Sequence, residues 1–310
     1  MQRSLIWIAR QAHRAGLPGV GRGLRLLAQK LPSLQMLRVP MTDGRSLYLD
    51  LREAMCWPYF FLGNIQYERG ETRFFGSVLR AGDVAVDIGA NVGWYATLFA
   101  EAVGPTGKVL AFEPNPTAFR LLAAAARAYP QLTPVASAVS NRTGEASLQI
   151  PTVGEAWFAR LGPLDAAMQV HSEACLLTTL DAVLQGEARA MVIKCDVEGF
   201  EREVLQGAAA LLAGPRPPLW VLEVNVKERF PGYHPEDIFR ILRASPGGYR
   251  FYSIDPASGV LGPINEKFDQ HGNAAAVPHW LAHRVEAAWL APMPQAAQTH
   301  TPVDRRVGVH

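Results

Sequence analysis

The sequence predicts an α/β fold, in which a mostly parallel β-sheet is covered by helices on both faces. From residue 83 onward, short and nearly continuous apolar segments alternate with segments of helical pattern. The clearest strands are expected at residues 84–88, 108–112, 191–195 and 219–224. Such apolar runs are typical of strands buried on both sides, as in parallel sheets whose crossover helices cover them.

The composition excludes several other classes of protein. Hydrophobic residues make up 49% of the 310 residues and charged residues 19%, which rules out disorder throughout the chain. Cys56, Cys175 and Cys195 are far apart and form no C-x-x-C pair, so neither a disulfide framework nor a zinc site is expected. Because no window holds about 18 uncharged apolar residues, we expect no membrane span and a cytoplasmic protein.

The charge of the chain is unevenly distributed. The net charge is +2, but all seven charged residues before Asp43 are basic. They are Arg3, Arg10, Arg14, Arg22, Arg25, Lys30 and Arg38. The rest of the chain carries 23 basic and 28 acidic residues, a net charge of −5. An acidic body argues against a nucleic-acid partner, whose recognition needs an excess of Lys and Arg.

The pattern divides the chain into four regions. They are a basic helical arm (1–34), a hairpin with a lead-in helix (35–82), the main domain (83–290) and a flexible tail (291–310). In the arm, a Gly-Leu-Pro-Gly sequence at 16–19 separates two short helices. The hairpin strands are expected at 36–39 and 46–51, and the lead-in helix at 71–79.

The other elements of the main domain follow from weaker patterns. Further strands are expected at residues 135–139, 144–150, 250–254 and 274–277. Residues 151–178 should form an irregular insertion, and residues 201–212 one helix. In open parallel sheets, ligands bind at the carboxyl ends of the strands, so the residues that end each strand are the candidate site.

The first strand ends in a glycine loop, DIGANVG, at residues 87–93. Its spacing is G-x-x-x-G rather than the dinucleotide fingerprint G-x-G-x-x-G. A pyrophosphate needs bare backbone amides without a carboxylate nearby, whereas Asp87 favours a cationic ligand. The loop therefore favours a positively charged nucleoside such as S-adenosylmethionine. The alternative is a tight strand-to-helix turn that binds nothing.

The second strand ends at Glu113, 24 residues after Gly89. An acid at this tip, about 20 residues after the glycine loop, suits the hydroxyl groups of a ribose. The alternative is an exposed acid ahead of the next helix, which Pro114 and Pro116 help to start.

The fourth and fifth strands end in a group of acids. Asp196 and Glu198 follow the fourth strand, and Glu223 and Asn225 end the fifth. Such residues can supply a carboxylate as general base or hard oxygen ligands to Mg²⁺. The alternative is that these acids lie in the first turn of a helix and stabilise the helix dipole. We adopt this interpretation for Glu203 but not for Asp196 or Glu198.

Five segments of the chain resemble the FkbM family of S-adenosylmethionine-dependent methyltransferases. They are VDIGANVGWYATLFA, AFEPNP, AVSNRTG, TTLDAVL and KCDVEGFEREVLQGA, in the family's order and within about residues 66–225. The resemblance implies a class I, Rossmann-like fold with a seven-stranded sheet whose last strand is reversed. It makes residues 83–290 the S-adenosylmethionine-binding catalytic domain. It also implies methylation of a hydroxyl oxygen on a sugar, glycolipid or polyketide-type molecule.

The resemblance implies roles for particular residues. The cofactor-binding loop contains Asp87, Gly89, Asn91 and Gly93, with the methionine end of the cofactor against it. Glu113 would bind the ribose. Ser137 and Ala138, after the third strand, would lie beside the adenine. The family's D-V-E-G segment is matched by Asp196 and Glu198.

Removal of the proton from an alcohol requires a base or a metal. Asp196 is the first candidate base. Alternatively, Asp196 binds the methionine ammonium, and Glu198 or a histidine, His171 or His234, acts as the base. We expect no resident metal; if Mg²⁺ is used, its ligands by position are Asp196, Glu223 and Asn225.

Two other functions share parts of this pattern. A nicotinamide-dependent oxidoreductase would also place an acid such as Glu113 against a ribose, but the spacing of the glycines argues against this function. A non-catalytic Rossmann-like interaction module would be expected to lose the glycine loop or Glu113, and both are present. The expected partner is a small-molecule, sugar or lipid-linked acceptor. The basic arm is interpreted either as a helix packed on the domain, as a peripheral contact to an anionic membrane surface, or as a transit peptide.

Overall fold

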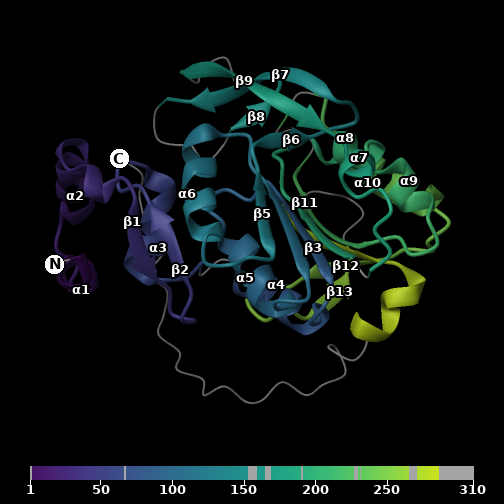
Figure 1. The fold of residues 1–310 in the computed structure, drawn as a ribbon, viewed down its shortest axis with the longest axis horizontal. Coiled ribbons are helices and arrows are strands. Elements are labelled where there is room, and N and C mark those ends of the chain that lie inside the picture. Colours follow the sequence, from purple (N-terminus) through teal and green to yellow (C-terminus); the bar gives the residue numbers. More distant parts are fainter. Residues whose placement is uncertain are drawn as a thin grey trace.

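The computed structural model describes residues 2–65, 68–152, 159–164, 169–189, 191–226, 230, 232–264 and 271–285. Its central feature is an eight-stranded sheet with strand order β13-β12-β14-β11-β10-β3-β4-β5 (Figure 1). The strands are β3 (Val84–Ile88), β4 (Lys108–Phe112), β5 (Leu132–Val135), β10 (Met191–Cys195), β11 (Leu219–Val224), β12 (Arg250–Ile254), β13 (Leu261–Pro263) and β14 (Gly272–Val277). The predicted tail at 291–310 lies outside the described residues.

The strand order reverses beside β3, in the middle of the sheet. The chain runs outward from β3 to β4 and β5, then returns to β10 on the other side of β3. Strands β5, β4, β3, β10 and β11 are parallel, and β14 lies between β11 and β12, antiparallel to both. The reversed last strand is therefore confirmed. The expected number of seven strands is wrong, because the short strand β13, which contains Gly262, adds an eighth at the edge.

Helices cover both faces of this sheet (Figure 1). One face carries α4 (Arg69–Val78), α5 (Trp94–Val103) and α6 (Pro116–Ala126). The other carries α7 (Leu180–Val183), α8 (Glu201–Gln206), α9 (Ala209–Ala213) and α10 (Pro235–Ala244). Alternate residues of β3 enter the two cores, Ala85 on one face and Val86 on the other, as the two-residue period of a strand requires. This two-sided burial explains the continuous apolar pattern of the strands.

The expected single helix at 201–212 is wrong, since the chain forms α8 and α9 with a break at Gly207. A β-carbon at Gly207 would lie 2.0 Å from the carbonyl oxygen of Ser140. The break thus coincides with a close backbone contact to the segment that follows β6.

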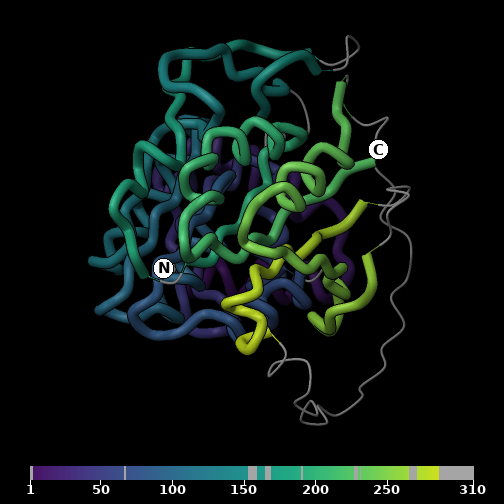
Figure 2. The backbone as a smooth tube through the Cα atoms, turned by 90° about the vertical axis from the view of Figure 1, so that its right-hand side faces the viewer, coloured from purple at the N-terminus to yellow at the C-terminus, as the bar shows by residue number. Residues whose placement is uncertain are grey.

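A second sheet, with order β6-β9-β7-β8, lies above the main sheet in Figure 1 and at the same end of the molecule in Figure 2. Its strands are β6 (Ser137–Val139), β7 (Gly144–Pro151), β8 (Arg160–Leu161) and β9 (Val170–Thr178). The strand predicted at 144–150 is confirmed. The irregular insertion predicted at 151–178 is wrong where it is described, because β8 and β9 lie in it.

The third strand predicted at 135–139 is also wrong. Two strands occupy this region instead: β5, which begins three residues before the predicted strand and belongs to the main sheet, and β6, which belongs to the second sheet. Pro134, inside β5, obscured this strand in the sequence because proline usually marks a strand boundary.

The N-terminal part packs beside α6. It contains α1 (Gln2–Arg14), α2 (Val20–Lys30), β1 (Leu37–Pro40), β2 (Ser46–Leu49) and α3 (Trp57–Leu62). The two arm helices and the antiparallel hairpin are confirmed, whereas α3 was not predicted. In the part of the chain that the structure describes, no helix combines the length and apolar character needed to cross a bilayer.

Candidate functional site

A cavity of about 1410 Å³ opens at the carboxyl ends of β3, β4, β10 and β11. Its other walls come from α3, from β7 and β8 of the second sheet, and from the β12–β13 hairpin. The volume exceeds the roughly 300–1,000 Å³ of ordinary small-molecule pockets, so there is room for more than one ligand. The residues predicted for the site that line this cavity are Gly89, Asn91, Glu113, Ser137, Ala138, Asp196, Glu198 and Glu223. Asp87, Gly93 and Asn225 do not line it.

Asp87 lies behind the cavity, in register with Lys194 on β10. It is 1% exposed, and neither carboxylate oxygen has a hydrogen-bond partner among the described residues. Burial raises its pKa to about 6, against the opposing effect of Lys194. Because Asp87 does not line the cavity, its carboxyl acts on a bound ligand through its charge, which is compatible with the cationic cofactor expected from the sequence.

The two loop glycines are required by the packing of the protein itself. Both have left-handed backbones, with φ of +80° at Gly89 and +90° at Gly93. A β-carbon at Gly89 would lie 1.9 Å from the carbonyl oxygen of Asp196, and one at Gly93 would lie 2.9 Å from Cδ1 of Leu122. The loop therefore turns directly under the end of β10 and against α6, whichever ligand binds there.

Glu113 joins the tip of β4 to the glycine loop. One carboxylate oxygen accepts the N–H of Asn91 at 2.7 Å, and the other accepts the N–H of Asn115 at 2.8 Å. The side chain is buried, which raises its pKa to about 7 in spite of these two donors. Each carboxylate oxygen has a second lone pair, so the group can still accept hydrogen bonds from a ribose.

Ser137 and Ala138 lie on β6, directly after β5, and both line the cavity. Both are largely buried. Their position beyond the third parallel strand of the sheet is the one that the sequence predicted for the adenine side, although the strand itself was misplaced.

Lys194 is a site residue to which the sequence analysis assigned no role. It lies on β10, 6% exposed, with Nζ 2.8 Å from Oδ2 of Asp196 and 5.1 Å from the ring centre of Tyr95. Burial opposes its charge, but the carboxylates of Asp196, Asp87 and Glu68 outweigh burial and raise the pKa of Lys194. The signal in the sequence is a lysine inside the otherwise apolar strand MVIKC.

The pKa values of Asp196 and Glu223 are shifted in opposite directions. Burial opposes ionisation of Asp196, but Lys194 outweighs it and lowers the pKa of Asp196. Burial, followed by the charge of Asp196, raises the pKa of Glu223 well above its ordinary value. Of these two neighbouring carboxyls, Asp196 therefore gives up its proton first.

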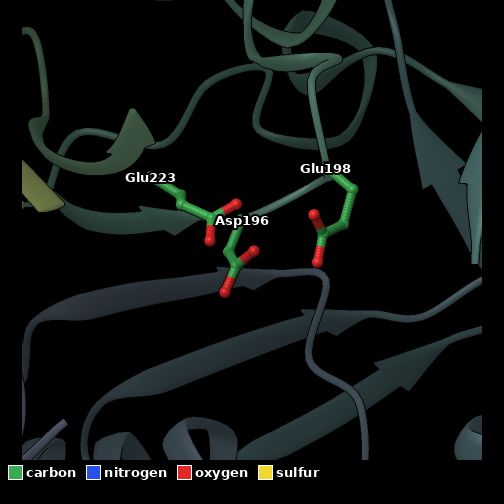
Figure 3. A group of neighbouring side chains, drawn as sticks. All are labelled: Asp196, Glu198 and Glu223. Carbon is green, nitrogen blue, oxygen red and sulfur yellow. The ribbon is translucent and has the colours of Figure 1, made fainter. Parts of the chain in front are cut away.

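The carboxylates of Asp196, Glu198 and Glu223 converge from the end of β10, the following loop and β11 (Figure 3). One oxygen from each lies within 4.8 Å of the other two. Glu198 reaches this position from a left-handed backbone, with φ of 53°. The structure thus brings together the three acids that the sequence placed at these strand ends.

Asn225 belongs to a neighbouring hydrogen-bond network. Its amide nitrogen donates to Glu223 at 2.9 Å, and its amide oxygen lies 3.1 Å from Nδ1 of His271. Of the oxygen ligands suggested for Mg²⁺, Asp196 and Glu223 belong to the converging group, and Asn225 is hydrogen-bonded to Glu223. His271 lines the cavity, whereas His171 and His234 do not.

Arg160 and Phe200 line the cavity beside the strand tips, and Phe230 lies behind them in the core. The guanidinium carbon of Arg160 lies 4.1 Å from the ring centre of Phe230 and 5.5 Å from that of Phe200. The side chain is 5% exposed, and its Nε has no hydrogen-bond partner among the described residues. Burial lowers the pKa of Arg160, partly offset by Glu201 and Glu198. No local pattern singles out this residue, which lies in the segment predicted to be irregular.

Comparisons with known proteins identify the family of the chain. The family described as "Methyltransferase FkbM domain" matches residues 87–251. Hexuronic acid methyltransferase AglP from Haloferax volcanii is 27% identical over 162 residues, which are 52% of this chain. The chain spans 61% of the length of that relative.

Among solved structures, a putative rRNA-methylase from Clostridium thermocellum aligns with a TM-score of 0.42 and 10% identity, over 69% of this chain and 95% of that one. TYW2 from M. jannaschii, in complex with AdoMet, aligns with a TM-score of 0.40 and 14% identity, over 78% of this chain and 85% of that one.

Proposed function

The chain belongs to the FkbM methyltransferase domain family, and we propose that it transfers a methyl group from S-adenosylmethionine to a hydroxyl oxygen of a sugar, glycolipid or polyketide-type acceptor. The carboxylate of Glu113 is the observation that carries this proposal. It lies at the tip of β4, beside the reversal of strand order, and holds the loop after β3 through the N–H of Asn91. A nucleoside that crosses these two strand tips places its ribose against Glu113.

The chain offers a place for each part of the cofactor. We assign the methionine end to the loop at 87–93, where the buried carboxyl of Asp87 favours a positive charge. We assign the ribose to Glu113 and the adenine to Ser137 and Ala138, which line the same cavity. When bound, S-adenosylmethionine supplies an electrophilic methyl group on a sulfonium.

We assign removal of the acceptor's hydroxyl proton to Asp196, with Glu198 as the second candidate. Lys194 keeps Asp196 ionised, so this carboxylate is ready to accept a proton. The same lysine makes Asp196 a weaker base, which is why Glu198, within the same converging group, has to be tested beside it. If Asp196 instead holds the methionine ammonium, its loss weakens cofactor binding more than turnover.

Arg160 and Phe200, which line the cavity, support a sugar-like acceptor. The ring of Phe200 offers a face on which a sugar ring can lie, and the guanidinium of Arg160 favours a carboxylate or phosphate on the acceptor. The relative AglP is named as a hexuronic acid methyltransferase, and an acidic sugar is accordingly the first acceptor class to assay.

The function is tested with the purified full chain. Calorimetric titration should show binding of S-adenosylmethionine and none of NAD, and mass spectrometry of the unfractionated protein should detect S-adenosylhomocysteine. Methyl transfer is then measured with radiolabelled S-adenosylmethionine and a panel of neutral sugars, acidic sugars, glycolipids and hydroxylated natural products.

Each competing function predicts a different outcome of these assays. Binding of NAD without S-adenosylmethionine would favour the oxidoreductase and overturn the proposal. Binding of neither compound would favour a non-catalytic module. Transfer to nitrogen or carbon with none to oxygen would keep the methyltransferase and reject O-methylation.

A further inference from the structure

The arm helices α1 and α2 expose an unusual amount of apolar side chain. Nine large hydrophobic residues are exposed among those described, and six of them lie in the first 31 residues. We call these six the outer arm surface: Trp7, Ile8, Leu17, Leu26, Leu27 and Leu31, which are 45–63% exposed. Clustered exposed apolar residues on a folded protein mark an interaction surface more often than scattered ones do.

The outer arm surface is separate from the contacts that fix the arm to the body. Ile6 and Leu24 point the other way and are buried in the main core. Arg10 donates from Nε to the carbonyl oxygen of Phe60 at 2.7 Å, and His13 stacks on Phe61 at 4.2 Å between ring centres. The inner face is thus already packed, whereas Leu27 on α2 and Leu31 directly after it remain exposed.

The charged side chains of the arm itself are all positive. Arg3, Arg14, Arg22, Arg25 and Lys30 are exposed on the same two helices, and no acidic residue precedes Asp43. Outside the arm, the carboxyl of Glu53 interacts with Arg25. The body, by contrast, has a net charge of −5. Figure 1 shows α1 and α2 together at one end of the molecule, beyond the hairpin β1–β2.

We propose that α1 and α2 bind to the surface of an anionic lipid membrane. The outer arm surface enters the boundary between headgroups and acyl chains, and the exposed arginines and lysine of the arm meet anionic headgroups. The absence of acids from the arm favours lipid over another copy of this chain, since apolar contact between two copies would bring together two unneutralised positive arms. The proposal does not depend on the methyltransferase activity.

Vesicle sedimentation of the full chain tests the proposal. Vesicles of phosphatidylcholine are compared with vesicles that contain about one-third phosphatidylglycerol. The chain should bind the anionic vesicles at least about ten-fold more tightly, and added salt should weaken this binding. Equal binding to both types, or no binding to either, would overturn the proposal.

Two sets of variants separate the arm from the rest of the protein. The triple variant Trp7→Ser, Ile8→Ser, Leu26→Ser should bind anionic vesicles at least about ten-fold more weakly. The matched control Val170→Ser, Leu176→Ser removes two exposed apolar residues of β9 and should bind like the unmodified chain. All three substituted arm positions are exposed, so circular dichroism should show the same folded content. Unchanged binding of the arm variant would reject the arm as the contact.

Sedimentation velocity without lipid tests whether a second copy of the chain, rather than a membrane, covers the outer arm surface. A dimer that disappears in the triple variant would assign the outer arm surface to a second copy and overturn the membrane proposal. The same sedimentation coefficient for both proteins, together with arm-dependent vesicle binding, supports it.

Discussion

The ammonium of Lys194 lies 2.8 Å from Oδ2 of Asp196, at the point where β10 ends and the cavity begins. The lysine is almost fully buried, and its charge is also felt by Asp87 and Glu68. The buried ammonium of Lys194 therefore offsets part of the negative charge of the site before any ligand binds. This relationship determines which carboxyls are ionised and how the site should respond to mutation.

Lys194→Met should destabilise the protein by about 3 kcal/mol, because it leaves buried carboxylates without their cation. The free energy of unfolding, measured with urea, checks this prediction. Lys30→Met, which removes an exposed lysine, serves as control. A loss of less than about 1 kcal/mol for Lys194→Met would mean that the carboxyls become neutral at little cost.

Asp196→Asn should lower turnover by about a hundred-fold while it changes the affinity for S-adenosylmethionine much less, because general-base catalysis contributes about 10²–10⁴ in rate. Glu173→Gln, an exposed acid on β9, should leave both quantities unchanged. Wild-type turnover in Asp196→Asn, combined with a loss in Glu198→Gln, would transfer the role of base to Glu198.

Glu113→Gln should weaken S-adenosylmethionine binding by about ten-fold or more. The amide keeps the shape of the carboxyl but loses its charge, and hydrogen bonds to a charged acceptor contribute about 1.5–3 kcal/mol. Calorimetric titration measures the effect, with Glu145→Gln on the exposed part of β7 as matched control. An unchanged dissociation constant would argue against ribose binding by Glu113.

The stability of the ligand-free protein should fall as the pH rises from about 5 to about 7.5. Burial raises the pKa of Glu68, Glu113 and Glu201 from 4.5 to about 7, and that of Asp87 from 3.8 to about 6. The folded state thus keeps protons that the unfolded state has released. Each group stabilises the fold below its unfolded pKa and loses this contribution as the pH passes its folded pKa.

Urea unfolding at a series of pH values measures this dependence. Glu113→Gln should make the curve less steep, because it removes one of the titrating groups. A flat or rising free energy of unfolding over the same interval would contradict the raised pKa values.

Gly89→Ala should destabilise the protein by more than about 2 kcal/mol, since the left-handed backbone and the lack of space both oppose a side chain. The new β-carbon would lie 1.9 Å from the carbonyl oxygen of Asp196. Gly76→Ala, inside α4, is the matched control, because no atom lies within 4 Å of its β-carbon position. Thermal unfolding compares the two variants, and equal stability would show that the loop after β3 can move away from β10.

The sequence was sufficient for the strands that are buried on both sides. Residues 84–88, 108–112, 191–195 and 219–224 were predicted with the bounds that the structure has. Their apolar runs end at polar residues or glycines, and no competing helical period is present. Because the ends of these strands were predicted correctly, the acids and glycines that follow them were also placed at the correct strand tips.

The second sheet and several cavity residues could not be predicted in this way. Strand β9 is exposed along much of its length, so its residues lack the apolar pattern of a core strand. The positions of Arg160 and His271 depend on neighbours that are distant in sequence, Phe230 for Arg160 and Asn225 for His271. Local patterns contain no information about such pairs.

The register of β6 and β9 has a consequence for protein engineering. The two strands are parallel neighbours, with Val139 opposite Thr178, so the chain leaves and rejoins the main domain at adjacent points. Loop-closure entropy changes little when a segment with fixed, neighbouring ends is lengthened or shortened. The described part of this segment, residues 140–177, contributes Leu148, Arg160 and Leu161 to the cavity, so exchanging it would alter that side of the cavity while the β3 and β4 tips stay as they are.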